Sequence, residues 1–360
     1  MFLKGEDVGP MVSPVCDDWA LDEPYRWPYS DPDPFPPGAP YHEVSQQMAM
    51  AGICGWDPTF WAEASFPPKN ADILPETQRR PSEHGTLVES RIRTPYGDLT
   101  SMAEEASSSR TIKPWLENEE DYRKAIWLTH QQADYDEDVT IEEGGRVRAA
   151  IGDRGVLGTW FEPPLVNFCN EDEVYYHMAD WPECFEELHE ATTELALKQV
   201  PTLRKAGFDY LFYCVSGTEW ISPGFFRSYV TENTRKIFEL WRAEGGFILW
   251  HTCGHVKLLI EEGFYSELKP DVFETLSVPP VGDLPSLGWA RQRLDPAIIT
   301  KGNIALDLLL NGPETEIRSA VYRVKEETRG YRHIVGLTDD VLHNTPLANC
   351  LAFVAAARES

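Results

Sequence analysis

The chain has 360 residues, of which 42% are hydrophobic, and its formal charge at pH 7 is −27. This acidity argues against nucleic acid and anionic membranes as partners, because both present phosphate groups that require a basic protein surface. No apolar stretch reaches the roughly 18 residues of a transmembrane helix, so the composition indicates an acidic globular protein with a sizeable core.

The N-terminal part of the chain has no regular helix–strand alternation. Seven prolines lie between Glu23 and Tyr41, and this density predicts an irregular loop, since proline lacks the amide hydrogen that helices and sheets need. From Leu87, alternating residues flank the turn signal Thr94-Pro-Tyr-Gly-Asp98, which predicts a β-hairpin. We expect one barrel domain over residues 1–360, with an elaboration over 20–145 within or before its regular repeat.

From about Val147, short apolar runs alternate with helical stretches, and this alternation predicts a parallel sheet. Two earlier runs, Met11–Cys16 and Ile53–Trp56, bring the strand count to eight. The fold class expected is therefore α/β, a closed (β/α)8 TIM barrel with an N-terminal elaboration formed by the proline-rich loop and the hairpin. The other six predicted strands are Val156–Phe161, Phe208–Val215, Gly246–Cys253, Val272–Val278, Ala297–Ile304 and His333–Leu337.

Helix signals separate these strands. Asp180-Trp-Pro-Glu183 is a capping box that predicts a helix ending at Gly207. A serine before a proline at Ser222-Pro223 predicts a second helix, which ends at Gly245. Further helices are predicted from Pro313 to Gly330 and from Thr345-Pro346 onward.

His251-Thr-Cys253 is the motif with the clearest chemistry. It ends the predicted strand Gly246–Cys253, and side chains two residues apart on a strand face the same way. Active sites of such barrels lie at the carboxyl ends of the strands, and an imidazole beside a thiol there forms half of a zinc site. By itself the motif is weak, because buried cysteines often act as small hydrophobic residues.

Carboxylates follow several other predicted strands. Glu274 and Asp339 are candidate metal ligands or acid–base groups, while Glu219 and Asp17 are candidates for orienting a substrate. Structural roles are also open, since Glu274 could accept backbone hydrogen bonds and Asp339 could cap the loop before the last helix.

The run Ile248-Leu-Trp-His-Thr-Cys-Gly-His-Val-Lys-Leu-Leu259 resembles the metal-binding strand of the uroporphyrinogen decarboxylase superfamily, in its cobamide-dependent methyltransferase branch. Other stretches are similar to the same family in the same order: Arg93–Leu99, Ala206–Tyr210, Ser222–Phe226, Pro279–Asp283, Lys301–Ile304 and Asn344–Asn349. The resemblance implies a (β/α)8 barrel in which His251 and Cys253 are two zinc ligands. The third family ligand is a cysteine, and its position falls on Asp339. Glu274 resembles the glutamate ligand of cobalamin-independent methionine synthases.

The activity that the resemblance implies is zinc-dependent methyl transfer between a small substrate and a corrinoid (cobalamin) cofactor carried by a partner protein. Because Asp339 replaces a thiolate with oxygen, we expect a stronger Lewis acid and a methyl ether donor, such as a methoxylated aromatic. This would make the protein an O-demethylase. Tryptophans that could contact an aromatic donor are Trp19, Trp56, Trp160 and Trp220.

Two alternative functions are open. The first is decarboxylation of a small carboxylic acid. Uroporphyrinogen itself is disfavoured, because Asp17, Asp18, Asp22 and Glu23 stand where that enzyme's arginine-rich segment grips its polycarboxylated substrate. The second is a barrel that binds a small ligand without catalysis.

The seven cysteines have no disulfide-like spacing, and no hydrophobic targeting segment begins the sequence, so we expect a cytoplasmic protein. The acidity itself fits solubility, a saline cytoplasm or a basic partner.

Overall fold

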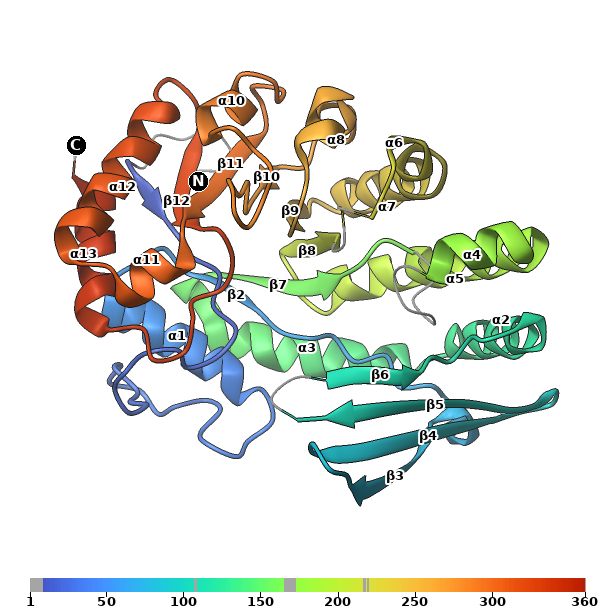
Figure 1. The fold of residues 1–360 in the computed structure, drawn as a ribbon. Coiled ribbons are helices and arrows are strands. Elements are labelled where there is room, and N and C mark those ends of the chain that lie inside the picture. Colours follow the sequence, from blue (N-terminus) through green and yellow to red (C-terminus); the bar gives the residue numbers. More distant parts are fainter. Residues whose placement is uncertain (1–8, 107–108, 165–172, 216–217, 219, 360) are drawn as a thin grey trace. The chain divides into compact units, whose positions relative to one another are not determined.

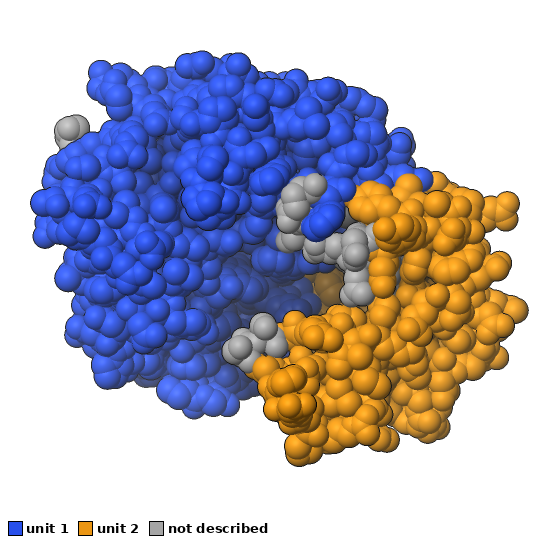
Figure 2. Space-filling model, in the orientation of Figure 1, with its two compact units in different colours: residues 1–64, 143–163, 204–360 blue, residues 65–142, 164–203 orange. Residues whose placement is uncertain are grey.

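The computed structural model describes residues 9–106, 109–164, 173–215, 218 and 220–359. These residues form two compact units (Figure 2): unit 1 comprises residues 1–64, 143–163 and 204–360, and unit 2 comprises residues 65–142 and 164–203. Unit 1 contains an eight-stranded sheet and unit 2 a four-stranded sheet (Figure 1).

The sheet of unit 1 is parallel throughout, in the order β1-β12-β11-β10-β9-β8-β7-β2. Its end strands meet, since Asp57 N donates to Val12 O and the hydroxyls of Ser13 and Thr59 are 2.7 Å apart. The predicted α/β class and (β/α)8 barrel are confirmed. The strands are β1 (Met11–Val12), β2 (Thr59–Trp61), β7 (Val156–Phe161), β8 (Tyr210–Val215), β9 (Phe247–Thr252), β10 (Val272–Phe273), β11 (Ile299–Ile304) and β12 (His333–Leu337).

Helices follow the strands of unit 1, mostly where capping signals predict them. Ser222 begins one of them, because its Oγ accepts a hydrogen bond from Phe225 N at 3.2 Å. The helices are α1 (His42–Cys54), α6 (Pro223–Phe225), the π-helix η4 (Phe226–Thr231), α7 (Glu232–Ala243), α8 (Lys257–Glu261), α9 (Phe264–Leu268), α10 (Leu287–Arg291), α11 (Leu306–Asn311), α12 (Glu314–Glu327) and α13 (Leu347–Arg358), with the 3-10 turn η3 (Gly152–Arg154). Among the described residues, none of the helices has the length and hydrophobicity needed to span a bilayer.

Unit 2 contains the predicted hairpin, which is confirmed: β4 (Thr86–Thr94) and β5 (Gly97–Glu105) pair antiparallel, and Gly97 turns the chain with φ 103°. The strands β3 (Glu76–Pro81) and β6 (Ser109–Lys113) flank them. The helices of this unit are η2 (Ala71–Ile73), α2 (Glu119–Gln132) and α4 (Glu173–Asp180), while α3 (Glu137–Ile151) and α5 (Pro182–Lys205) each run from one unit into the other. Residues 20–64 and 143–145 of the elaboration expected over 20–145 belong to the barrel unit. The proline-rich segment has neither helix nor ladder between Pro24 and Pro40.

The predicted strand at Ile53–Trp56 is wrong. Ile53 belongs to the end of α1, Gly55 ends this helix with φ 78°, and the strand β2 begins at Thr59. A short apolar run does not by itself distinguish a strand from the end of a buried helix. The strand predicted at Val272–Val278 is shorter than expected, because Thr275 and Leu276 have φ values of 74° and 45°, which no strand accommodates.

The barrel interior consists of layers, and these place the functional side chains. The lower part is an apolar, buried cluster that consists of Val15, Tyr210, Phe212, Leu249, Val272, Ile299 and Ile334. Two residues farther along their strands, at the carboxyl end, the inward positions hold His251, Glu274, Lys301 and Gly336. The polar layer therefore rests directly on the apolar one.

Candidate metal centre

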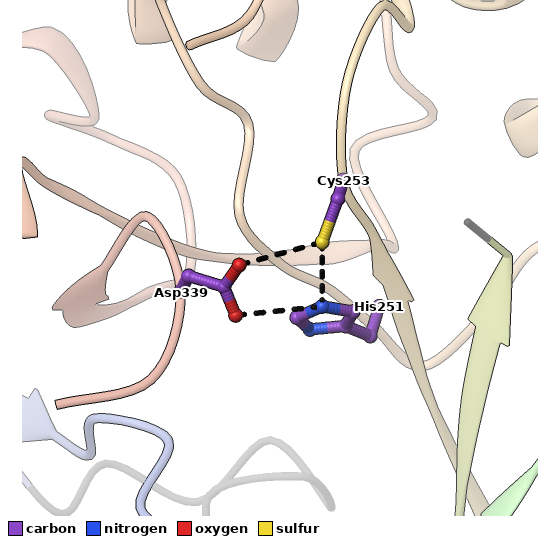
Figure 3. Close-up of side chains that lie close together, drawn as sticks. All are labelled: His251, Cys253 and Asp339. Carbon is purple, nitrogen blue, oxygen red and sulfur yellow. Dashed lines mark hydrogen bonds and ion pairs between the residues drawn. The ribbon is translucent and has the colours of Figure 1, made fainter. Parts of the chain in front are cut away.

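His251 and Cys253 lie on the same side of the β9 end, as the strand periodicity predicts, and Asp339 approaches them from the loop after β12 (Figure 3). The Nε2 of His251 is 3.1 Å from the Sγ of Cys253. The carboxylate oxygens of Asp339 lie 3.4 Å from that sulfur and 3.7 Å from that nitrogen. One ligand atom from each residue lies within 4.8 Å of the other two.

These three donors are a nitrogen, a sulfur and an oxygen, the mixture that zinc accepts. Burial and the nearby Asp339 carboxylate both raise the pKa of the Cys253 thiol. The thiol and the carboxylate therefore share a site whose negative charge is unfavourable until a cation compensates it. The residues present fit a divalent metal ion of the zinc type, with three protein ligands and room in the coordination sphere for a fourth.

Glu274 lies behind the imidazole rather than beside the sulfur. Its Oε1 is 2.6 Å from the Nδ1 of His251, and its Oε2 is 2.6 Å from the Nζ of Lys301. The side chains of Lys301 and Glu274 are only 3% and 1% exposed. Burial alone would raise the pKa of Glu274, but the Lys301 ammonium and His251 hold it below its usual value. Glu274 is therefore a carboxylate and accepts its hydrogen bonds.

This arrangement sets the tautomer of His251. Because a carboxylate has no proton to donate, the Nδ1 of His251 carries the hydrogen of their 2.6 Å contact. The lone pair of a neutral imidazole is then on Nε2, which faces Cys253 and Asp339. A carboxylate behind the histidine is the usual support of a zinc-binding imidazole, since it holds the ring in place and raises its basicity.

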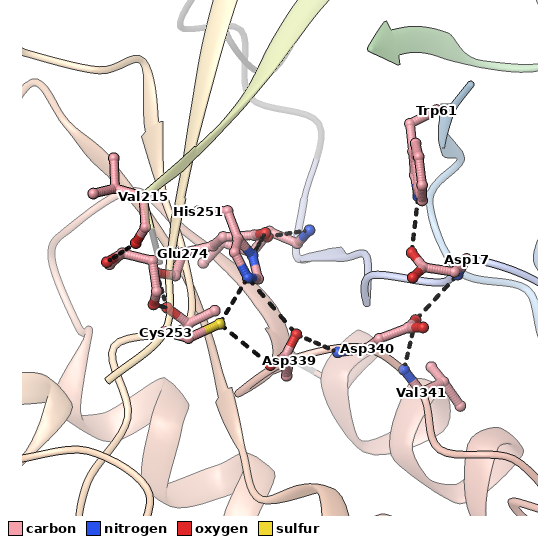
Figure 4. A network of polar contacts seen from close by, with 12 residues as sticks. Asp17, Trp61, Val215, His251, Cys253, Glu274, Asp339, Asp340 and Val341 are labelled. Carbon is pink, nitrogen blue, oxygen red and sulfur yellow. Dashed lines mark hydrogen bonds and ion pairs between the residues drawn. The ribbon is translucent and has the colours of Figure 1, made fainter. Parts of the chain in front are cut away.

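Acidic residues continue from Asp339 along the edge of the site (Figure 4). Asp340 N donates to Asp339 Oδ1 at 2.9 Å, Asp17 N donates to Asp340 Oδ1 at 3.1 Å, and Trp61 Nε1 donates to Asp17 Oδ1 at 3.0 Å. Burial and the Asp17 charge raise the pKa of Asp340 to about 8, and burial also raises the pKa of Asp17. This pair of carboxyl groups retains a proton near neutral pH. Glu219, the other candidate for substrate orientation, lies outside the described residues.

Aromatic rings cover the remaining side of His251. Phe212 stacks on the imidazole with ring centroids 5.1 Å apart, and Trp160 stacks on Phe212 at 5.4 Å. The ring centroids of Trp61 and Trp160 are 6.1 Å apart. Of the other tryptophans expected near the site, Trp56 is buried, Trp19 donates to Glu23 O and Trp220 is exposed.

Three residues of this site were not identified from the sequence: Lys301, Phe212 and Trp61. The sequence did contain a signal for Lys301. It lies two residues after Ile299 on β11, so the side chains of both residues point into the barrel. Trp61 and Phe212 resemble ordinary core residues in sequence.

Comparison with known proteins defines the class. Residues 171–360 match the uroporphyrinogen decarboxylase (URO-D) family, which is more than half of the chain. The chain belongs to this family, and the resemblance to the superfamily is confirmed.

Two individual relatives show how similar this chain is to known proteins. A uroporphyrinogen decarboxylase of Gluconobacter oxydans (strain 621H) is 28% identical over 180 residues, which is 49% of each protein. The chain thus spans about half the length of this curated relative. A methyltransferase from Methanosarcina mazei superposes with a TM-score of 0.63 at 16% identity, covering 99% of this chain and 95% of the other. This likeness shows the fold.

Proposed function

We propose that the protein is a zinc-dependent methyltransferase that moves a methyl group between a small substrate and a corrinoid cofactor carried by a partner protein. The observation that carries the proposal is the cluster of His251, Cys253 and Asp339, with ligand atoms within 4.8 Å and with Glu274 orienting the imidazole. The Methanosarcina structure with the same fold is described as a methyltransferase, which supports this choice within the family.

Each residue has a defined task in this proposal. His251 offers Nε2, Cys253 offers a thiolate and Asp339 offers a carboxylate oxygen, while Lys301 neutralises Glu274 so that this carboxylate only orients the ring. When bound, zinc supplies Lewis acidity toward an oxygen or sulfur atom of the substrate. Glu274 is thereby assigned to orientation, and the fourth zinc position is open to the substrate.

Metal analysis tests the proposal. We expect stoichiometric zinc in the purified protein, and its loss in His251→Ala and Cys253→Ser. The matched control is His255→Ala, which removes an exposed imidazole four residues from His251 and is expected to retain zinc. Methyl transfer to or from reduced cobalamin is then followed by the change in corrinoid absorbance. A protein without zinc, or one that keeps zinc in both ligand variants, would overturn the proposal.

Decarboxylation of a small carboxylic acid is the second candidate. The proton held by Asp17 and Asp340 favours it, because the carbanion left after CO2 departs must be protonated. The same acidic edge disfavours a polycarboxylated substrate such as uroporphyrinogen. Release of CO2 from small acids that persists after chelation of the metal would favour this candidate over methyl transfer.

A further inference from the structure

The candidate metal centre is bordered by two groups of side chains with opposite chemistry. The aromatic arc consists of Trp61, Trp160 and Phe212, whose ring centroids lie 5.4–6.3 Å from one another. The acidic arc consists of Asp17, Asp340 and Asp339, joined in that order by backbone-to-carboxylate hydrogen bonds.

The two arcs meet at both ends. Trp61 donates to Asp17 at one end (Figure 4). At the other end Phe212 stacks on His251, whose Nε2 faces Asp339. The contacts therefore form a closed ring of side chains, half aromatic and half acidic, with the candidate metal ligands as part of it.

The aromatic arc is held with ring faces that suit a positive charge. Trp61 Nε1 donates to Asp17 at 3.0 Å, and Trp160 Nε1 donates to Glu162 at 3.1 Å. Both indole N–H groups are thus satisfied by carboxylates at the ring edge. Phe212 is only 2% exposed and stacks on both His251 and Trp160. The rings of the arc that a cationic ligand can reach are therefore the indoles, whose faces carry a negative quadrupole. Trp160 is 38% exposed, which is substantial for an indole next to a buried imidazole.

The acidic arc differs from the rest of the site in its lack of an ion pair with a described lysine or arginine. Within the described residues, no ion pair joins Asp17, Asp339 or Asp340 to a lysine or an arginine. Lys301 is a buried cation of the same site, but Glu274 already neutralises it at 2.6 Å. A divalent ion on Asp339 and Cys253 would still leave Asp17 and Asp340 without a cationic side chain as partner among the residues that the structure describes.

We propose that this ring binds the methyl donor as a cation, a methylated ammonium or sulfonium group, with its methyl groups against the aromatic arc and its charge toward the acidic arc. The inference deepens the proposed function and rests on it, because only that function makes the bound cation a methyl donor. A neutral methoxylated aromatic would also stack on Trp160, but it gains nothing from the carboxylates, and an anionic one would be repelled. Aromatic faces combined with carboxylates are the chemistry that recognises quaternary ammonium groups.

Equilibrium binding to the purified zinc-loaded protein tests the inference without corrinoid or turnover. The probes are choline, its neutral isostere 3,3-dimethylbutan-1-ol, and the neutral methoxyarene 4-methoxybenzyl alcohol, each followed by isothermal titration calorimetry. Choline is expected to bind about tenfold more tightly than the isostere, since only its charge differs. Equal binding of the two, preference for the methoxyarene, or no binding of choline would overturn the inference.

Variants locate the binding. Trp160→Leu is expected to weaken choline about tenfold and Trp160→Phe by less, because phenylalanine keeps a π face. The control Trp27→Leu removes an indole that donates to Asp31 O in the proline-rich loop and should leave binding unchanged. Asp17→Asn should weaken choline but not the isostere, whereas Asp31→Asn should affect neither. If Trp160→Leu, shown folded by circular dichroism, binds choline as the unaltered protein does, the inference fails.

The two proposals fail separately. A protein that contains zinc and transfers methyl groups from neutral methoxyarenes, but does not bind choline, would overturn the proposal of a cationic donor. The proposed methyltransferase function would then still hold. Choline binding that follows Trp160 and Asp17 in a protein lacking zinc would support the cation site and overturn the methyltransferase.

Discussion

The inner and outer halves of the site differ in whether their charged side chains have counter-charges. The inner half is the buried triad of Lys301, Glu274 and His251, in which a 2.6 Å ion pair and a 2.6 Å hydrogen bond leave each charge compensated. The outer half is the acidic arc of Asp17, Asp340 and Asp339, where the side chain of Asp339 is 43% exposed. The inner half needs no ligand and serves to orient His251. The outer half keeps an excess of negative charge, which a positive ligand would compensate.

Removal of the Glu274 charge should have the largest consequence, because it disrupts the inner half. Glu274→Gln leaves the buried Lys301 ammonium without its counter-charge, so the free energy of unfolding should fall by about 3–5 kcal/mol. Zinc affinity should also fall, by about 10- to 100-fold, since the imidazole loses its orienting carboxylate. Urea denaturation and chelator competition measure the two quantities.

A double variant sharpens this result. Glu274→Gln combined with Lys301→Met removes both charges and should recover most of the stability without recovering the zinc affinity. A single variant as stable as the unaltered protein would show that the pair is not the buried ion pair described above.

The next effect belongs to the outer half. Asp339→Asn removes a proposed ligand and should lower zinc affinity by about 100-fold with little change in stability, because the side chain is partly exposed. Asp340→Asn is the matched control, one residue away, and should retain zinc. Competition with a chromophoric chelator distinguishes them, and equal zinc affinity in both variants would remove Asp339 from the metal site.

Acid should destabilise the strand that carries Lys301. His333 contacts Thr300 and Gly302 at 2.9 Å on either side of Lys301, and burial lowers its pKa to about 4. The unfolded chain takes up this proton near the usual histidine pKa of about 6.5. His333 therefore contributes stability above pH 6.5 that is lost as the pH falls from 6.5 toward 4, by about 3 kcal/mol.

Thermal unfolding between pH 7.5 and 4.5 measures this loss. Gln at position 333 does not titrate, so His333→Gln should show a shallower pH dependence than the unaltered protein. Parallel curves for the two proteins would contradict the assignment.

The smallest effect concerns the space beside Lys301. A Cβ at Gly336 would lie 3.2 Å from Ser13 O and 3.3 Å from Lys301 Cγ, so Gly336→Ala should cost about 1–2 kcal/mol of unfolding free energy. Gly145→Ala is the control: its Cβ would meet no atom within 4 Å, and alanine in a helix should add about 0.5–1 kcal/mol. A neutral Gly336→Ala variant would show that Lys301 has room to move.

Much of the barrel follows from local pattern. The predicted strands Val156–Phe161 and His333–Leu337 agree with β7 and β12 at both ends, because buried parallel strands are short apolar runs bounded by helix signals. Strands that consist of two residues, such as β1 and β10, leave too little pattern to define their ends. The position of β2 was missed because the apolar run predicted as a strand includes the end of α1.

The local strand pattern is enough to show that His251 and Cys253 share one face, since alternation along a strand is a property of the backbone. It also placed Glu274 and Asp339 at strand ends that converge. The folded barrel, by contrast, brings Glu274 to Nδ1 of His251 with Lys301 behind it. It also places Asp340, Asp17 and Trp61 in a row that continues from Asp339. These are contacts between strands and loops far apart in the chain, and they depend on barrel packing that no local periodicity encodes.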